Sequence, residues 1–402
     1  SLQIASRIDY MLISKDLKSN IVNTDIRPVV RGDHNAVTIS INIGNTNCGP
    51  GYWKFNASLL SKRNYCEEVK LLIKDTVKEK IKSSMSWQEA WELCKIRIRE
   101  YSINFVKSEK KNKDNEITLL EEKLQHLNDN MWTGSENRIQ DTLLEHEQIV
   151  EQLRKIYKKK CQGAIIRSRV KWFEEGEKNT KYFLSLEQRN FDKSVIALLR
   201  DEKGKHIRNQ ERIRKCVHGF YSKLYSLNNS RSDLDTYFLN LINPQLTNEL
   251  AESCEGKLTE EECKQVVYGF ERNKAPGSDG FNIEFYQHFW NEIKVMVVES
   301  LNEGFINNEL SITQRQAIIK LLYKKGDKTK LENWRPISLL NYDYKIAASV
   351  LVKRLQSVIS VIISPDQVGY IKGRSLAENI RLIDDIFYYV QNNSPEGKAF
   401  LS

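Results

Sequence analysis

No proline lies between Pro50 and Pro244 of this 402-residue chain. Proline removes a backbone donor and breaks helix interiors, so its absence over so long a stretch favours helix. The same stretch is rich in Glu, Lys, Gln and Leu, which are good helix formers. We therefore expect a mostly helical middle region.

Heptad-like spacing predicts that part of this region folds as an antiparallel helical hairpin. Two sets of apolar residues carry the spacing: Leu120, Leu124, Leu127 and Met131, then Leu143, Val150, Leu153 and Tyr157. The turn is expected at residues 132–135, where Ser135 is a good N-cap. Two short helices joined by a tight turn can cover each other, so we interpret the apolar stripe as packing within the chain.

Short strands are expected on either side of the helices. The stretches "RIDYMLIS" (7–14) and "AVTISINI" (36–43) alternate apolar and polar residues as strands do, and "VIALLRDEKGKHI" (195–207) reads as a short hairpin. The last third combines a strand at 317–324 with helices at 284–302, 342–362 and 376–391. The predicted fold class is α+β, mostly helical.

Composition excludes several classes of protein. The chain is 40% hydrophobic and 29% charged, and no apolar run reaches the length of a membrane span, so neither a membrane protein nor a disordered chain is indicated. The seven cysteines show no CxxC spacing, which is typical of reduced thiols in an intracellular protein. No Cys/His cluster has the spacing of a zinc site.

Positive charge is concentrated in two blocks. Residues 154–171 hold eight Lys/Arg and no acid, and residues 316–375 hold eleven against four acids. Such blocks indicate surfaces that face a polyanion, although a solvated helix face would give the same pattern.

Three segments could carry nucleic-acid or nucleotide chemistry. In "NKAPGSDGFNIEFY" (273–286), Lys274 lies on a turn where it could touch phosphate, but taken in isolation the segment is better interpreted as a plain loop between helices. In residues 317–346, a predicted two-stranded finger places Lys320 and Arg335 near its base, and such a pair of cations suits a triphosphate. Pro336 holds Arg335 in extended backbone.

The third segment, "SPDQVGYIKGRSLAENIRLIDDI" (364–386), places aromatic and basic groups at a glycine-flanked helix start, which can hold a nucleic-acid backbone. The candidate residues are Gln367, Gly369, Tyr370, Lys372 and Arg374.

The order and spacing of these segments resemble the fingers of the reverse transcriptase of LINE-type (non-LTR) retrotransposons. That family carries "KAPGxDG", "WRPISLLN" and "QxGFxxGR" in this order, and here they stand at 274–280, 334–341 and 367–374, with Tyr370 in place of the usual Phe. Residues 176–190 resemble the segment just upstream of that polymerase, so the resemblance covers residues 160–402.

The N-terminus resembles the last two motifs of the same family's apurinic-type endonuclease, "SRID" at 6–9 and "GDHNAV" at 32–37. The resemblance implies that Asp9 orients His34 for attack on a phosphodiester, with Asp33 beside them. A carboxylate behind an imidazole fixes its tautomer. Gly32 replaces the usual Ser, and the earlier strands of that nuclease fold are missing, so we expect no active nuclease here.

The resemblance implies four parts. They are a remnant of the endonuclease β-sandwich (1–44), a helical linker with the hairpin (45–160), an N-terminal extension (161–257) and reverse-transcriptase fingers without the palm (258–402). Both ends look cut, because the chain starts without Met and stops in an incipient strand, "GKAFLS".

The implied function is RNA-directed DNA synthesis with Mg²⁺, an RNA template, target DNA and deoxynucleoside triphosphates, in cytoplasm and nucleus. No palm aspartates are found, because Asp384 and Asp385 fall in an amphipathic helix, so we expect this chain to bind without catalysing. The alternative is a stand-alone, non-catalytic nucleic-acid-binding protein.

Overall fold

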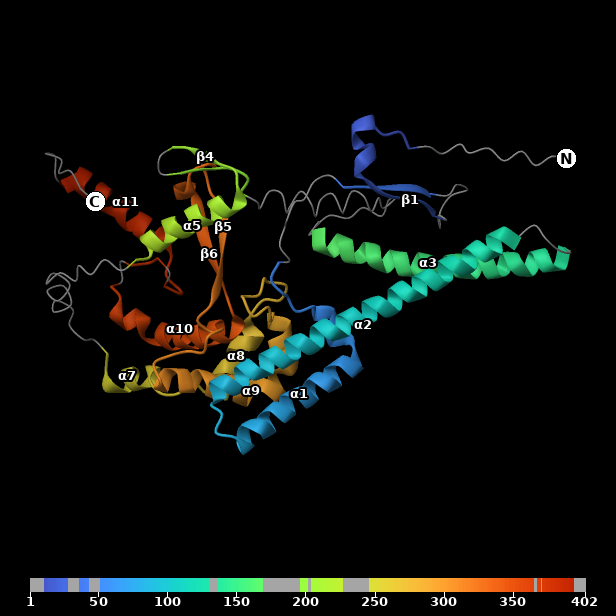
Figure 1. Cartoon of the computed structure of the whole chain (residues 1–402). Coiled ribbons are helices and arrows are strands. Elements are labelled where there is room, and N and C mark those ends of the chain that lie inside the picture. Colours follow the sequence, from blue (N-terminus) through green and yellow to red (C-terminus); the bar gives the residue numbers. More distant parts are fainter. Residues whose placement is uncertain are drawn as a thin grey trace. The chain divides into compact units, whose positions relative to one another are not determined.

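The computed structural model describes residues 11–27, 36–42, 51–130, 136–168, 196–201, 204–226, 246–364, 367–369 and 371–393. These residues are mostly helical with a few short strands, as expected for an α+β chain (Figure 1). The chain divides into two compact units. The first unit comprises Ser1–Gly51, Ile103–Cys216 and Gly326–Leu331, and the second comprises Tyr52–Ser102, Val217–Lys325 and Glu332–Ser402. Within the described part of the chain, no helix is both long and apolar enough to cross a membrane.

The strands near the N-terminus are only partly where the sequence predicted them. Strand β2 (Ala36–Ile41) lies in the predicted 36–43 stretch, and its antiparallel partner is β1 (Ile21–Arg27). The strand predicted at 7–14 is wrong over its described part, because Met11–Ser14 belong to no strand and a short 3-10 helix, Lys15–Asn20, follows them. The stretch "IVNTDIR" is richer in β-branched residues than the one predicted, and such residues favour pleated backbone.

The helical hairpin is confirmed. Helices α2 (Trp87–Asn130) and α3 (Glu136–Ser168) enclose a core made of Ile117, Leu120, Leu124, Ile149 and Leu153. Leu127, Val150 and Tyr157 pack against this core, as the spacing predicted, whereas Leu143 is 43% exposed. The Tyr157 hydroxyl donates to Glu121 Oε1 at 2.6 Å, which fixes the register of the two helices. Met131 and the predicted turn lie outside the described residues.

The short hairpin expected in residues 195–207 is also present. Strand β3 (Leu199–Arg200) pairs with β4 (His206–Ile207) in antiparallel register. Gly204 has a φ of +80° in the connecting turn, a conformation that glycine adopts without strain. The Arg200 amide donates to the Thr329 carbonyl at 2.8 Å, so this hairpin also pairs with residues 326–331.

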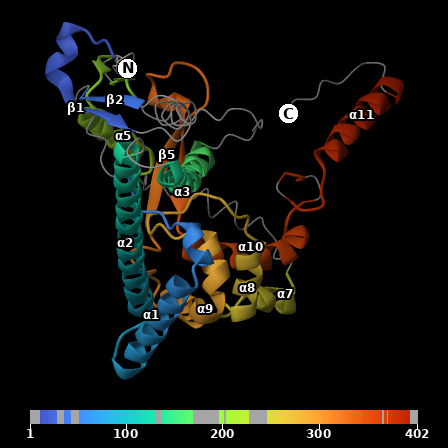
Figure 2. The same ribbon diagram turned by 90° about the vertical axis from the view of Figure 1, so that its right-hand side faces the viewer.

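The second unit is built around helix α9 (Ile283–Ile306), whose Phe285, Tyr286, Phe289 and Trp290 are buried. Figure 2 shows α9 between α1 (Arg63–Lys82) and α8 (Glu260–Gly269). The other helices described here are α5 (Gln210–Leu224), α7 (Asn248–Cys254), α10 (Tyr342–Ile362) and α11 (Leu376–Asn393). Helix α10 has the bounds that the sequence predicted, and α9 and α11 include the predicted spans.

Strands β5 (Ala317–Tyr323) and β6 (Trp334–Leu340) form a two-stranded antiparallel sheet, as expected for the finger. A 3-10 turn, η3 (Leu331–Asn333), precedes β6. The finger is therefore a hairpin whose second strand is followed, after the N-cap Asn341, by α10.

Helices α8 and α10 are joined by the ion pair between Glu262 and Arg354. The Arg354 guanidinium donates from Nε and Nη2 to both Glu262 oxygens at 2.7 and 2.8 Å, and to the carbonyls of Gly256 and Lys257 at 2.9 Å each. Glu262 also completes a capping box with Thr259 at the start of α8. The hydrogen bonds from Arg354 are the main cause that lowers the pKa of Glu262 to about 2.

Replacing Glu262 with Gln should lower the free energy of unfolding of the second unit by about 1–3 kcal/mol, because a bidentate charge-assisted contact is lost. Since the folded-state pKa of Glu262 lies below its ordinary 4.5, the wild-type advantage should be complete above pH 4.5 and disappear as the pH falls toward 2. Urea unfolding followed by tryptophan fluorescence measures both effects.

The matched control is Glu67→Gln, which breaks the exposed i,i+4 pair with Arg63 and should change stability by no more than about 0.5 kcal/mol. Equal losses in the two variants would contradict a special role for the Glu262 pair.

Candidate functional site

Asn341 joins two of the motif segments that the sequence singled out. It ends the "WRPISLLN" stretch as the N-cap of α10, and its Oδ1 accepts from the Asp279 amide at 3.2 Å. Its Nδ2 donates to the Thr313 carbonyl at 2.7 Å and to Ser278 Oγ at 3.2 Å. The loop 276–280 and the end of β6, about 60 residues apart in sequence, therefore meet at one buried amide.

Glycine is required where this loop touches Asn341. A Cβ at position 277 would lie 2.0 Å from Asn341 Oδ1 and 2.5 Å from its backbone nitrogen. Gly280 has a φ of +83°, and a Cβ there would lie 2.3 Å from the Trp53 carbonyl. Both glycines of the motif are thus explained by close backbone approach.

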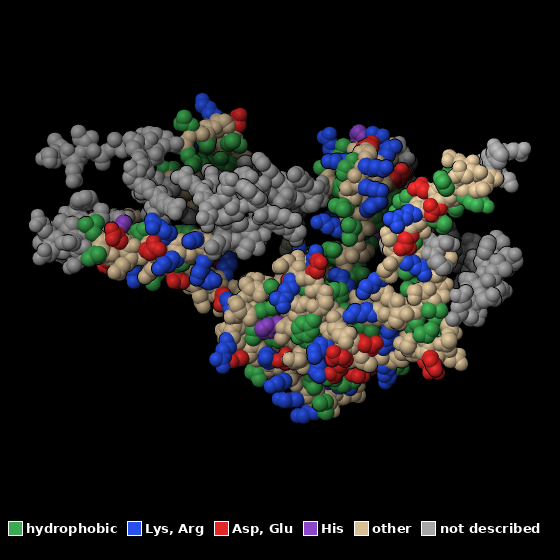
Figure 3. All heavy atoms as spheres, turned by 180° about the vertical axis from the view of Figure 1, so that it is seen from behind, with side chains coloured by type: hydrophobic (Ala, Val, Ile, Leu, Met, Phe, Trp, Pro, Cys, Tyr) green, Lys and Arg blue, Asp and Glu red, His purple; other side chains and the backbone are tan. Residues whose placement is uncertain are grey.

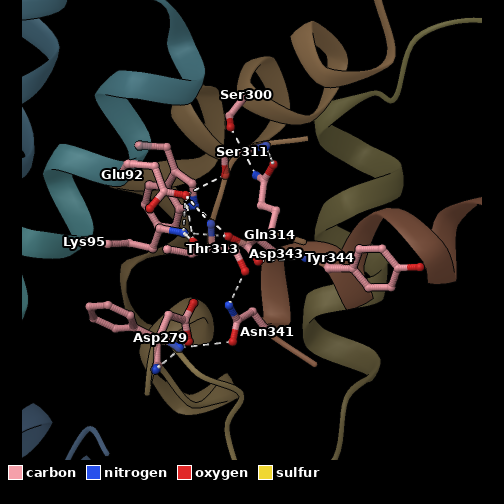
Figure 4. Close-up of polar contacts among 12 residues, drawn as sticks. Glu92, Lys95, Asp279, Ser300, Ser311, Thr313, Gln314, Asn341, Asp343 and Tyr344 are labelled. Carbon is pink, nitrogen blue, oxygen red and sulfur yellow. Dashed lines mark hydrogen bonds and ion pairs between the residues drawn. The ribbon is translucent and has the colours of Figure 1, made fainter. Parts of the chain in front are cut away.

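A buried ion pair lies directly beyond Asn341. Asp343 is fully buried, and its Oδ2 accepts from Lys95 Nζ at 3.0 Å and from Trp91 Nε1 at 2.9 Å. Lys95 is itself 4% exposed, and both donors come from the first turns of α2 (Figure 4). Burial alone would lower the pKa of Lys95, but the carboxylates of Asp343 and Glu92 raise it above its ordinary value.

Glu92 ties the same cluster to the segment before β5. Its Oε1 accepts from Lys95 Nζ at 3.2 Å, from Ser311 Oγ at 2.5 Å and from Thr313 Oγ1 at 2.7 Å. Lys95 also donates to Thr313 Oγ1. The base of the β5–β6 hairpin is consequently anchored at both ends, through Thr313 before β5 and Asn341 after β6.

Asp279 is the fourth charged member of the cluster. It is 7% exposed, and burial, with the nearby charge of Asp343, raises its pKa to about 7. Its Oδ1 accepts from the Phe281 amide at 3.0 Å, whereas Oδ2 has no hydrogen-bond partner among the described residues. Burial therefore favours the protonated form of this carboxyl more than solvent would.

The hydrogen bonds and ion pairs of the cluster join α2, the segment before β5 and the start of α10. Lys95 neutralises the carboxylates that surround it, and the described residues contain no group of three or more His, Cys, Asp or Glu that could hold a metal ion. What the cluster positions is the exposed β5–β6 hairpin.

Lys320 and Arg335 lie on one face of this hairpin. Lys320 is opposite Ile337 and Arg335 is opposite Leu322, so the two cations are diagonal neighbours on the same face. Both are exposed, and neither forms an ion pair with another described residue. They lie in the middle of the sheet and toward its turn, not at the base where the sequence analysis placed them.

The other candidate residues are not gathered into one site. Lys274 is exposed on its loop and pairs with Glu271 at 2.9 Å. Gln367, Gly369 and Lys372 are exposed in the connection between α10 and α11. Asp9, Asp33, His34 and Tyr370 lie outside the described residues.

Arg374 has a structural role in this connection. Its guanidinium donates to the carbonyls of Ser364 at 2.5 Å, Gln367 at 2.8 Å and Ile363 at 3.1 Å. These contacts satisfy the carbonyl of the C-cap residue Ile363, where helices leave acceptors unpaired, and two carbonyls of the connection that follows. The side chain is therefore already engaged by protein groups.

Sequence reasoning missed the members of the buried cluster. Lys95, one helical turn after the apolar Trp91, reads as an ordinary surface lysine. A lysine that continues an apolar stripe at i+4 is the signal that could have revealed it. Asp343, two residues after the end of the "WRPISLLN" stretch, gave no separate signal.

Replacing Lys95 with Met should lower the free energy of unfolding of the second unit by about 3–5 kcal/mol, since Asp343 would remain buried without its cation. The double variant with Asp343→Asn should lose less than the sum of the two single losses. Urea unfolding of all four proteins gives the coupling energy.

The control is Lys78→Met, which breaks an exposed pair with Asp75 and should change stability by less than about 1 kcal/mol. Additive losses for Lys95 and Asp343 would contradict direct pairing.

Comparison with known proteins places this site in a family. Residues 323–401, which begin at the end of β5, match the family model described as reverse transcriptase (RNA-dependent DNA polymerase). Over 99% of its length the chain is 30% identical to "Transposon TX1 uncharacterized 149 kDa protein" of Xenopus laevis, and it spans about 30% of that protein's length. The relationship predicted from the motifs is confirmed: the chain is a relative of the reverse transcriptases of LINE-type, or non-LTR, retrotransposons.

Proposed function

We propose that this chain supplies nucleotide-binding and nucleic-acid-binding fingers to an RNA-directed DNA polymerase of a LINE-type retrotransposon. The reverse transcriptase match at 323–401 and the transposon relative support this proposal. The observation that carries it is the pair of exposed cations on one face of the β5–β6 hairpin, Lys320 and Arg335.

This pair suits the triphosphate of an incoming deoxynucleotide. Arg335 offers a planar fork of donors and Lys320 a compact ammonium, and a polyphosphate can accept from both at once. The hairpin is anchored at its base by Asn341 and Thr313, so the cations lie on a scaffold held in place. Positioning of this kind reduces the ordering that binding would otherwise require.

The template strand is proposed to contact loops that carry single exposed groups. Lys274 lies on the 273–282 loop, and Gln367, Gly369 and Lys372 lie between α10 and α11. We include Tyr370 on the family motif alone, and we assign Arg374 the role of holding this connection on α10. Contacts of this kind position a backbone without reading its sequence.

Enzymes of this family generally use divalent metal ions, and Mg²⁺ is our proposal for the whole enzyme. The described residues do not fit that role, since they offer no cluster of metal-ligating side chains. We therefore assign no catalytic step to them.

The four-part organisation remains part of the proposal, with an endonuclease remnant at 1–44 that includes Asp9, Asp33 and His34. The four-part organisation assigns residues 52–102 to the linker, whereas in the structure these residues belong to the same compact unit as residues 217–325. The alternative function, a stand-alone nucleic-acid-binding protein, predicts nucleic-acid binding without nucleotide binding.

Combined Lys320→Ala and Arg335→Ala should weaken binding of a deoxynucleoside triphosphate by at least about tenfold, because two charge-assisted contacts of about 1.5–3 kcal/mol each are removed. Titration of the 402-residue chain with a fluorescent deoxynucleotide and Mg²⁺ measures the change.

The matched control is Lys324→Ala with Lys325→Ala, which removes the same charge where β5 enters its turn. Equal weakening of deoxynucleotide binding in both double variants would show that only the net positive charge matters and would contradict a specific role for Lys320 and Arg335. Absence of deoxynucleotide binding by the unaltered chain, with nucleic-acid binding retained, would favour the alternative function.

A further inference from the structure

Helix α3 presents a group of lysines on the side opposite to its packed face. Lys155, Lys158 and Lys159 are exposed, and at 100° per residue they cluster about half a turn away from Leu153 and Ile149. We call these three residues the α3 lysine patch. Figure 3 shows Lys and Arg side chains on the exposed surface of the hairpin.

The positive charge of this patch is not neutralised within the described part of the chain. None of the three lysines forms an ion pair there, and the nearest acid on α3, Glu151, is engaged by Arg154 at 3.1 Å. Glu121, across from α3 on α2, accepts the hydrogen bond of Tyr157. The charge therefore remains available to a partner.

Helix stability does not account for the patch either. Cations stabilise a helix through its dipole only near the last turn, and α3 continues for nine residues after Lys159, to Ser168. Three neighbouring lysines at i, i+3 and i+4 repel one another, which destabilises an isolated helix slightly.

A second group of lysines lies on α2. Residues 107–113 contain Lys107, Lys110, Lys111 and Lys113, all exposed, and one acid, Glu109. The Tyr157–Glu121 contact places Lys159 beside residue 119 or so, which puts Lys113 about 9 Å further along the hairpin axis. At that separation, about one Debye length at physiological ionic strength, the electrostatic coupling between the two groups is largely screened, so each group would contact phosphate on its own along the hairpin.

We propose that the α3 lysine patch, with the lysines at 107–113 of α2, binds the phosphodiester backbone of nucleic acid, separately from the β5–β6 hairpin. The inference goes beyond the polymerase role proposed above and does not depend on nucleotide binding. It gives the helical hairpin a function of its own, which is to hold RNA or DNA at a surface remote in sequence from the fingers.

Phosphate is the ligand chemistry that fits this surface best. Lysine is a compact point charge that contacts phosphate without a fixed geometry, so it suits backbone binding that is indifferent to base sequence. The apolar residues between the lysines, Ile156 and Tyr157, pack against the hairpin core, and no exposed apolar side chain interrupts the patch as membrane insertion would require.

The test is the salt dependence of binding by the 402-residue chain, measured by fluorescence anisotropy with a single-stranded RNA and a DNA duplex. Changing Lys155, Lys158 and Lys159 to Gln should reduce the slope of log K against log salt by about 2 for the single strand and about 3 for the duplex. Gln is nearly as good a helix former as Lys, so α3 should keep its circular dichroism signal.

Changing Lys107, Lys110, Lys111 and Lys113 to Gln should reduce the slope by a similar amount. The control removes three lysines from the surface of the second unit, Lys74, Lys82 and Lys257, and should leave the slope nearly unchanged. The ratio of the RNA and DNA binding constants at one salt concentration tells which nucleic acid the surface prefers.

An unchanged slope in both hairpin variants, or an equal reduction in the control, would overturn the proposal. Displacement of the RNA by polyglutamate at equal charge concentration would show instead that the surface binds acidic peptide. Deoxynucleotide binding tests only the β5–β6 hairpin, and the salt slope tests only the lysines of α2 and α3. Failure of one proposal can therefore be told apart from failure of the other.

Discussion

The second unit depends on one buried ion pair, between Lys95 of α2 and Asp343 of α10. Taking both charges out of water costs several kcal/mol each, and this is offset only when further groups complete their hydrogen bonds. Trp91, Thr313 and Glu92 supply those groups, and they come from α2 and from the segment before β5. The hydrogen bonds of Lys95 and Asp343 are therefore complete only when these separate parts of the chain have come together. The ion pair thus forms together with the tertiary structure and not with any one local element.

The ion pair holds in place the base of the exposed β5–β6 hairpin. Asn341, which lies next to the ion pair in the cluster, contacts the loop at 276–280. It also contacts Thr313, so the residues just before β5 and just after β6 meet at the cluster. The cluster is buried, with Lys95 paired to Glu92 and Asp343, and its hydrogen bonds position the segments that meet there. The cations proposed to meet nucleotide lie on the exposed hairpin, and those proposed to meet nucleic acid lie on α2 and α3. The charged residues that stabilise the fold are thus different from the exposed cations proposed to bind nucleotide and nucleic acid.

The sequence predicted the elements whose information is local. Heptad spacing predicted the hairpin core around Leu120 and Leu153, and the helix predicted at 342–362 is α10. It failed where tertiary context decides. The stretch at 7–14 alternates as well as a strand does, but β2 pairs with Ile21–Arg27 instead. Arg374 was predicted to contact nucleic acid, yet its guanidinium donates to the carbonyls of Ile363, Ser364 and Gln367 in the segment that follows α10. Lys95 continues an apolar stripe after Trp91, but its partner Asp343 lies 248 residues away, so the ion pair could not be predicted from local sequence.

The claim that α2 holds the motif segments through this pair can be tested by hydrogen–deuterium exchange of the Lys95→Met variant. The account predicts faster exchange in three places at once: the first turns of α2, the loop at 276–282 and the residues from Asn341 to the start of α10. The α2–α3 hairpin core around Leu124 should exchange as before, which provides an internal reference. Faster exchange confined to the start of α2, with the loop and Asn341 still protected, would contradict it.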